Sequence, residues 1–332
     1  MKEESVKKSM GKEKTVADRE DPALKGEIVS SIRSRLLALK KRLFIGLSGL
    51  KLTTEERRWL AHKDVAGVIL FSRNYQDKPQ LTALTAEIQE INPELLISVD
   101  HEGGRVQRFR DGFTQLPPMR ELGRLYDQSR EAALSEAYQL GSIMASELIA
   151  VGVDFSYAPV CDIDYGVNPA IGDRAFHDDP TVVTELVLAF YRGVRAAGSV
   201  GVAKHFPGHG FVNIDTHVAI AQDDRPLTLL EERDLKPFRA LIDAGIEALM
   251  PAHIIFTALD ADNSVISSEK WLRYLREELA FQGAIISDDL DMGGASHLGS
   301  VKEKVDRCFS AGIDIVLLCN DFQAIRELLT VD

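Results

Sequence analysis

Residues 95–105 read LLISVDHEGGR, and this stretch contains the pattern that decides the fold. A short apolar run ends in Asp100 and is followed at once by charged residues and two glycines. Such a run is typical of a strand in a parallel sheet that helices cover on both faces. Gly103 and Gly104 allow the backbone to turn sharply after the strand. The stretch therefore predicts a buried strand whose carboxyl end is polar.

The same pattern recurs along the 332-residue chain, and helical patterns separate the repeats. The other predicted strands are residues 42–49, 67–72, 154–160, 201–206, 248–253, 283–289 and 314–320. The predicted helices are residues 53–62, 78–91, 129–152, 179–198, 227–245, 267–281 and 301–312. Eight strands alternating with helices predict an α/β fold, a single (β/α)8 TIM barrel over residues 42–332. A doubly wound open sheet is the alternative, but GLSGLKLT (46–53) lacks the glycine-rich phosphate loop expected after its first strand.

The N-terminal region is expected to form a short extension of the barrel domain. Residues 1–26 are too polar to bury a core, which predicts disorder. Residues 27–41 place Ile32 and Leu36 at helical spacing, which predicts a helix that packs on the barrel. A basic helix lying on a membrane surface is the alternative interpretation of that segment.

Composition excludes several classes of partner. The net charge of −12 argues against nucleic acid and against an anionic membrane surface. The sequence shows neither the apolar core of a signal peptide nor a run of about 20 apolar residues that could span a membrane. Three cysteines in no metal-binding spacing favour a reducing compartment. A soluble, cytoplasmic and monomeric protein is expected.

Polar side chains gather at the carboxyl ends of the predicted strands. Asp100, Lys204 with His205, His253 and Asp288 all lie at such ends. In a barrel these ends open onto one face, where active sites lie. The pattern therefore predicts one polar site at that face.

Three kinds of chemistry compete for this site. A catalytic metal is disfavoured because Pro207 and Gly208 separate His205 from His209, so no helix presents both rings. Phosphate binding lacks the spacing of a phosphate loop. Glycosidic chemistry needs a carboxylate nucleophile and a proton donor. Asp288 suits the first role, and the Asp215-Thr216-His217 turn suits the second.

Several long motifs then match a known family. KHFPGHG (204–210), followed by Asp215 and His217, resembles the signature of family 3 glycoside hydrolases, in their bacterial β-N-acetylglucosaminidase branch. Further matching segments are DHEGGRVQRFRDGFTQLPP (100–118), IGDRAFHDDP (171–180), MPAHI (250–254) and ISDDLDMGGA (286–295). The resemblance covers about residues 42–330.

The resemblance implies a retaining hydrolase of terminal β-linked N-acetylglucosamine that takes part in peptidoglycan recycling. Its substrate would be a small carbohydrate, N-acetylglucosamine joined to 1,6-anhydro-N-acetylmuramic acid with or without peptide. The resemblance implies no cofactor and no metal. By the same resemblance Asp288 is the nucleophile, and His217 is the acid/base with Asp215 as its partner. The implied sugar-binding residues are Asp100, Arg108, Arg174, Lys204 and His205.

The chain departs from the family pattern at three places. His101 stands where glutamine is usual, Asp291 where serine is usual, and residues 219–221 lack a common proline. None of these removes a catalytic group. Three other interpretations remain: a β-glucosaminide phosphorylase, another family 3 β-glycosidase and a non-catalytic sugar-binding barrel.

Four finer expectations accompany these assignments. Only one of Asp288 and Asp289 should face the reaction centre, because adjacent strand residues point to opposite sides. Asp289 is expected to bond neighbouring loops. His209 and His253 are expected to be structural. The glycines of GHGFVNIDTH (208–217) are expected to act as a hinge.

Overall fold

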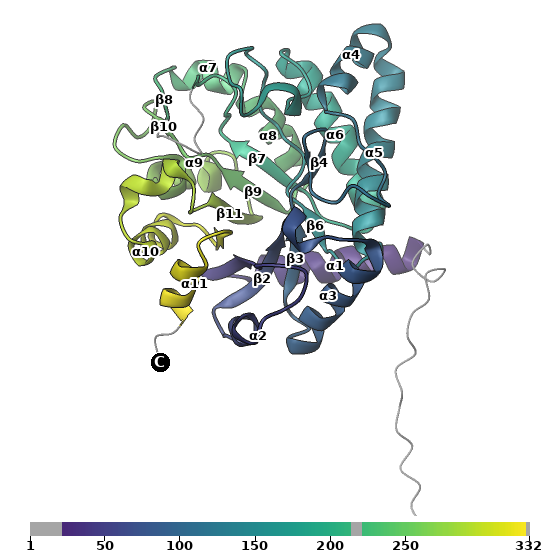
Figure 1. Ribbon diagram of the computed structural model, residues 1–332. Helices are drawn as coiled ribbons and strands as arrows, with labels where there is room; N and C mark the ends of the chain where they lie inside the picture. Colours follow the sequence, from purple (N-terminus) through teal and green to yellow (C-terminus); the bar gives the residue numbers. More distant parts are fainter. Residues whose placement is uncertain (1–21, 214–220, 330–332) are drawn as a thin grey trace, which may run out of the picture.

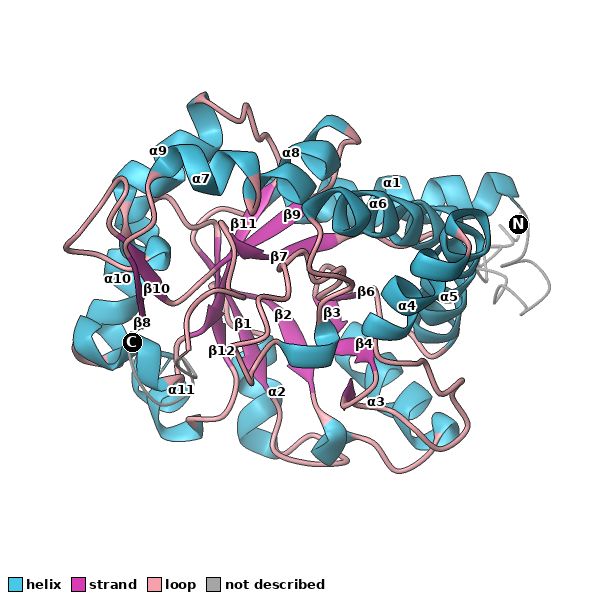
Figure 2. Ribbon diagram, turned by 90° about the horizontal axis from the view of Figure 1, so that it is seen from above, coloured by secondary structure: helices cyan, strands magenta, loops and turns pink. Residues whose placement is uncertain are grey.

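Eight parallel strands form a closed barrel surrounded by helices (Figures 1 and 2). The computed structural model describes residues 22–213 and 221–329. The strands are β1 (Arg42–Gly46), β2 (Val65–Leu70), β3 (Leu96–Val99), β6 (Phe155–Ser156), β7 (Val202–Phe206), β9 (Ala248–Pro251), β11 (Ala284–Asp289) and β12 (Ile315–Leu318). Each of them falls on one of the eight predicted runs.

The barrel closes between β6 and β7, the two ends of the strand order β6-β3-β2-β1-β12-β11-β9-β7. Val160, just beyond β6, forms a parallel bridge with Lys204 of β7. The N–H of Cys161 donates to the carbonyl of Lys204 at 2.6 Å, and the N–H of Val202 donates to the carbonyl of Ala158 at 2.9 Å. Closure confirms the predicted barrel and excludes the open doubly wound sheet.

Helices surround the barrel. They are α1 (Pro22–Ala38), α2 (Thr54–Leu60), α3 (Lys78–Ile91), α4 (Arg120–Gln128), α5 (Arg130–Ala150), α6 (Pro180–Ala196), α7 (Leu227–Glu232), α8 (Leu235–Asp243), α9 (Glu269–Glu277), α10 (Val301–Ala311) and α11 (Phe322–Leu329). Thr53 caps α2 in a capping box with Glu56, as the sequence predicts. Neither α4 nor α11 was anticipated.

The predicted helix over residues 227–245 is wrong in one respect, because it is two helices, α7 and α8. Pro237 has no N–H to continue a helix from α7, so it fits only in the first turn of α8. The Asp234 carboxylate at the break bonds Arg225 and Tyr165 instead of facing solvent. A tertiary contact thus ends the first helix.

Two apolar layers hold the barrel together. The inner layer takes residues from every barrel strand, including Phe44, Phe155 and Ile286. The outer layer packs the other faces of the strands against the helices. The inner-layer residues nearest the carboxyl ends of the strands, among them Tyr157 and Met250, also line a cavity at that end of the barrel.

Helix α1 closes the amino end of the barrel. Its Ile32 and Leu36 are buried and belong to the inner layer. Burying side chains of this size stabilises the fold by about 1.5–3 kcal/mol each. Packing of this helix on the barrel was predicted, although α1 begins at Pro22 rather than 27 and ends at Ala38 rather than 41.

Two small sheets extend beyond the carboxyl ends. β4 (His101–Gly103) directly follows β3 and pairs antiparallel with β5 (Val106–Gln107). β10 (Ile254–Phe256) follows β9 and pairs parallel with β8 (Ala221–Asp223). Among the described residues, no helix is long and apolar enough to cross a membrane.

Candidate active site

A cavity of about 490 Å³ lies at the carboxyl ends of the strands. Its lining includes the six predicted site residues that the structure describes, Asp100, Arg108, Arg174, Lys204, His205 and Asp288. They come from segments that are as much as 188 positions apart, from residue 100 to residue 288. The closed barrel brings them together because all its strands end on one face.

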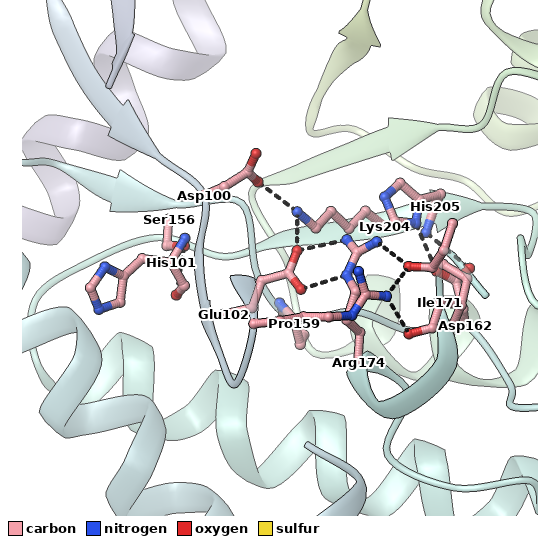
Figure 3. A network of polar contacts seen from close by, with 12 residues as sticks. Asp100, His101, Glu102, Ser156, Pro159, Asp162, Ile171, Arg174, Lys204 and His205 are labelled. Atoms are coloured by element: carbon pink, nitrogen blue, oxygen red, sulfur yellow. Dashed lines mark hydrogen bonds and ion pairs between the residues drawn. The ribbon is translucent and has the colours of Figure 1, made fainter. Parts of the chain in front are cut away.

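Two carboxylates and two cations form a network at one wall of this cavity, in which Glu102 and Lys204 are buried (Figure 3). The ammonium group of Lys204 lies 2.8 Å from Asp100 and 2.6 Å from Glu102. Arg174 donates two hydrogen bonds to Glu102, both at 2.8 Å. Such a two-pronged pair fixes the position of the guanidinium as well as its charge.

The network holds its charges in the ionised state. Burial opposes ionisation of Glu102, but the charges of Arg174 and Lys204 outweigh it and hold the pKa of Glu102 well below its usual range. Burial also opposes the charge of Lys204, and Asp100 and Glu102 nevertheless raise the pKa of Lys204. Arg108 lies 3.5 Å from the other oxygen of Asp100. Asp100 is therefore a fixed acceptor at the cavity wall, flanked by two cations.

Asp288 and Asp289 both line the cavity, so the expectation that only one of them would face it is wrong, although their contacts differ. Asp288 continues the inward-facing row of Ala284 and Ile286 on β11. Burial opposes ionisation of Asp288, but the charge of His205 and the N–H of Asp289 outweigh it and hold the pKa of Asp288 below its usual range. Asp288 is thus an ionised carboxylate in the cavity, which suits a nucleophile.

Asp289 bonds a neighbouring loop, as the sequence analysis expects. It accepts hydrogen bonds from the N–H of Cys319 at 3.2 Å and from the side chain of Asn320 at 3.2 Å. Asp291, one of the departures from the family pattern, accepts from the N–H groups of Cys319, Asn320 and Asp321. Burial and the Asp291 carboxylate raise the pKa of Asp289 to about 7.

His205 is held by a carboxylate that the sequence analysis assigned no role. Its Nδ1 lies 2.7 Å from Oδ2 of Asp162, which is fully buried. The other oxygen of Asp162 accepts the N–H groups of His205 at 3.2 Å and His209 at 2.7 Å. His209 is buried and lies against Asn168, whose amide donates to its Nδ1 at 3.0 Å. This is the structural role expected for His209.

Two other histidines are neutral and buried. Burial lowers the pKa of His101 to about 3, and its ring packs against Phe109 and Phe113. The substitution of His101 for the usual glutamine therefore fills an aromatic pocket beside Asp100. His253 is fully buried and its Nε2 lies 3.0 Å from the Asp289 carbonyl, a structural contact.

Sequence reasoning missed Glu102 and left Asp162 without a function. A period of two puts Glu102 on the same face as Asp100, so alternation was an available signal. Asp162 follows β6 by a few residues, but its partner is 43 positions away. Only the closure of β6 against β7 reveals that pairing.

The predicted acid/base pair, Asp215 and His217, lies outside the described residues, as do residues 219–221. The stretch before it is described and buried up to Gly210. A Cβ on Gly208 would lie 2.8 Å from the Asp234 carboxylate, and one on Gly210 would lie 1.8 Å from the carbonyl oxygen of Ile163. Close packing accounts for both glycines, and the expected hinge motion stays a prediction.

The described residues contain no group of three histidine, cysteine, aspartate or glutamate side chains that could hold a metal ion. Fold and cavity together define a barrel enzyme whose fixed carboxylates and cations suit a small polyhydroxylated substrate.

Comparison with known proteins gives the family. Residues 31–331 match the glycosyl hydrolase family 3 N terminal domain, and the chain belongs to this family. It is 49% identical to a β-hexosaminidase of Nitrosomonas eutropha. The alignment of 290 residues covers 87% of this chain and 83% of the relative. A β-hexosaminidase of Thiobacillus denitrificans is also 49% identical, over 86% of this chain and 80% of the relative.

Solved structures agree with this assignment. NagZ from Neisseria gonorrhoeae in complex with N-trifluoroacetyl-D-glucosamine has a TM-score of 0.83 and 43% identity, over 87% of this chain and 84% of that one. A family 3 β-N-acetylglucosaminidase from Paenibacillus has a TM-score of 0.82 and 32% identity, over 90% of this chain and 56% of that one. The chain is a glycoside hydrolase of the β-hexosaminidase type.

Proposed function

We propose that the protein is a retaining exo-β-N-acetylglucosaminidase that uses Asp288 as its nucleophile. The observation that carries this proposal is the position of Asp288, an inward-facing carboxylate on β11 with its pKa held low. A carboxylate in this state can attack the anomeric carbon and form a covalent glycosyl-enzyme.

The proton transfers are assigned to His217 with Asp215 as its partner. In the first step His217 donates a proton to the leaving oxygen while Asp288 forms its bond to the sugar. In the second step neutral His217 takes a proton from water, which displaces Asp288 from the anomeric carbon with retention. An imidazole with an ordinary pKa near 6.5 can serve in both directions near neutral pH.

The charged network would hold the sugar. Asp100 is placed to accept hydrogen bonds from hydroxyl groups, because Lys204 and Arg108 fix its carboxylate from two sides. Arg174 supports this wall through Glu102. His205 presents an imidazole edge from the adjacent part of the lining. Fixed donors and acceptors of this kind orient the ring for attack.

The proposed substrate is terminal β-linked N-acetylglucosamine on 1,6-anhydro-N-acetylmuramic acid, with or without peptide. Release of the sugar from such fragments belongs to peptidoglycan recycling in the cytoplasm, and the protein is proposed to act there as a monomer. The names of the relatives and the N-acetylglucosamine analogue bound to the Neisseria gonorrhoeae protein support this choice.

A panel of aryl β-glycosides tests the proposal. Hydrolysis of the N-acetylglucosaminide should greatly exceed that of the glucoside and the xyloside. The first-formed product, observed by ¹H NMR, should be the β-anomer, and it should be free sugar even in phosphate buffer. Release of the α-anomer, or of a sugar 1-phosphate, would contradict the proposed mechanism.

A further inference from the structure

Asp162 stands out among the described residues because it is buried, charged and unused by the mechanism above. It is fully buried, and burial opposes its ionisation. The charge of His205 and its hydrogen bond outweigh burial and hold the pKa of Asp162 below its usual range. A buried carboxylate is costly unless it is paired and hydrogen-bonded, so its partners indicate what it does.

The two oxygens of Asp162 have different partners. Among the described residues, Oδ1 accepts backbone N–H groups, those of His205 and His209. Oδ2 faces one side-chain atom, Nδ1 of His205, at 2.7 Å (Figure 3). Oδ1 therefore fixes the backbone at His205 and His209, and Oδ2 determines which ring nitrogen of His205 carries a hydrogen.

We propose that Asp162 is a positioning residue of the glycosidase reaction: it keeps the hydrogen of His205 on Nδ1 and thereby directs Nε2 to the sugar. A carboxylate can only accept at this distance, so Nδ1 must be the protonated nitrogen. Nε2 is then the nitrogen that a sugar hydroxyl can reach from the cavity. The inference rests on the proposed function, in which His205 contacts the sugar.

The same carboxylate connects the sugar-binding ring to the chain that leads to the proposed acid/base. Beyond the N–H of His209, the amide of Asn168 donates to the carbonyls of His209 and Val212, both at 2.8 Å. The Asn168 oxygen accepts the N–H of Ala170, which lines the cavity. Asp162 thus belongs to a buried network of fixed geometry, which is what a positioning residue needs.

Asp162→Asn separates the two roles of the carboxylate. The asparagine oxygen can still accept the N–H groups of His205 and His209, so the chain stays in place. Its NH2 group now faces Nδ1 of His205, so the ring can no longer carry a hydrogen on Nδ1 and stays neutral with its hydrogen on Nε2. We expect kcat/KM for an aryl N-acetylglucosaminide to fall roughly 10²-fold, the size of a positioning defect. Asp164→Asn, two residues along and outside the cavity lining, is the matched control and should leave kcat/KM unchanged.

A double-mutant cycle with His205→Ala shows whether Asp162 acts through this ring. If it does, Asp162→Asn should cost less than about threefold in the His205→Ala background. An equal loss in both backgrounds would mean a general structural effect and would overturn the inference. Wild-type activity of Asp162→Asn, alongside an inactive Asp288→Ala, would overturn the inference and leave the proposed function standing. A fully active Asp288→Ala would remove both.

A measurement on the unmodified protein keeps the inference testable even if a variant does not fold. In ¹⁵N NMR spectra at neutral pH, the His205 signals, assigned by their loss in His205→Ala, should show a protonated Nδ1. A neutral ring protonated only at Nε2 would contradict the proposal.

Discussion

The two ends of the barrel use charged residues in opposite ways. At the amino end, three carboxylates of the described residues each meet a cation from a neighbouring element. Asp154 pairs with Arg35 of α1, Asp314 with Lys40 and Arg276, and Glu247 with Arg195. At the carboxyl end, Asp100 and Glu102 share Lys204, while Asp289 faces Asp291 and neither forms an ion pair within the described part of the chain.

This difference indicates that the charged residues of the amino end serve stability and those of the carboxyl end serve function. Local pairing at the amino end leaves little charge unbalanced, and α1 covers that end with apolar side chains. The carboxyl end keeps carboxylates close together around a cavity. This arrangement does not stabilise the folded state, but it leaves hydrogen-bond acceptors available for a ligand. Substitutions at the carboxyl end should therefore change activity, and those at the amino end should change stability.

Asp288→Ala should produce the largest effect. Removal of the nucleophile should lower kcat on an aryl N-acetylglucosaminide by about 10⁴-fold or more. The melting temperature should stay the same or rise, because a partly buried carboxylate leaves the cavity. Asp224→Ala, at an exposed position outside the cavity, is the control. Substantial turnover by a well-folded Asp288→Ala would refute the nucleophile assignment.

Lys204→Met should come second. The change leaves Asp100 and Glu102 close together without their shared cation, so the acceptor at the wall loses its fixed position. We expect kcat/KM to fall roughly 10²- to 10³-fold, which corresponds to removing one partner of a buried ion pair. Lys40→Met, the same substitution at an exposed position of the amino end, should keep full activity. Equal losses of activity in the two variants would contradict the claim that charged residues serve activity at the carboxyl end and stability at the amino end.

The fold was largely predictable because its signal is local. Each strand is a short apolar run. The polar residues Asp100, Lys204 and Asp288 at the carboxyl ends of three such runs indicate the face that the strands share. What could not be predicted depends on closure of the barrel: the pairing of Asp162 with His205 and that of Glu102 with Arg174 join segments 43 and 72 positions apart. The break between α7 and α8 had a local signal in Pro237, but the role of the buried Asp234 at the break depends on its tertiary contacts with Arg225 and Tyr165.

Arg276→Ala tests the amino end. Arg276 bonds Asp314 at 2.8 Å and the carbonyls of Phe281 and Gly283. Its loss leaves a buried carboxylate partly uncompensated, so the free energy of unfolding in urea should fall by about 2–3 kcal/mol. Lys40→Ala removes a more exposed cation from the same carboxylate and should cost under about 1 kcal/mol. Both variants should keep wild-type kcat/KM, and a clear loss of activity in either would show that the ends are coupled.

Asp289→Asn should have the smallest effect on activity, and its effect on stability should change with pH. The pKa of Asp289 is raised to about 7 in the folded protein, against an ordinary value of 3.8. Between about pH 4 and 7 the folded state therefore holds a proton that the unfolded chain releases. This group favours folding at low pH, and its contribution declines as pH rises through that window. Buried neutral histidines such as His101 act in the opposite direction, so wild-type stability alone does not isolate Asp289.

The informative quantity is the difference in unfolding free energy between Asp289→Asn and the wild type. Asparagine stays neutral, so this difference should grow in favour of the variant from about pH 4 to 7, by about 4 kcal/mol for a shift of about three pKa units, and stay constant above. Asp291→Asn removes the neighbouring charge and should end the window at a lower pH. A difference that is flat with pH would mean that Asp289 is ionised throughout, and that the carboxyl end balances its charges as fully as the amino end does.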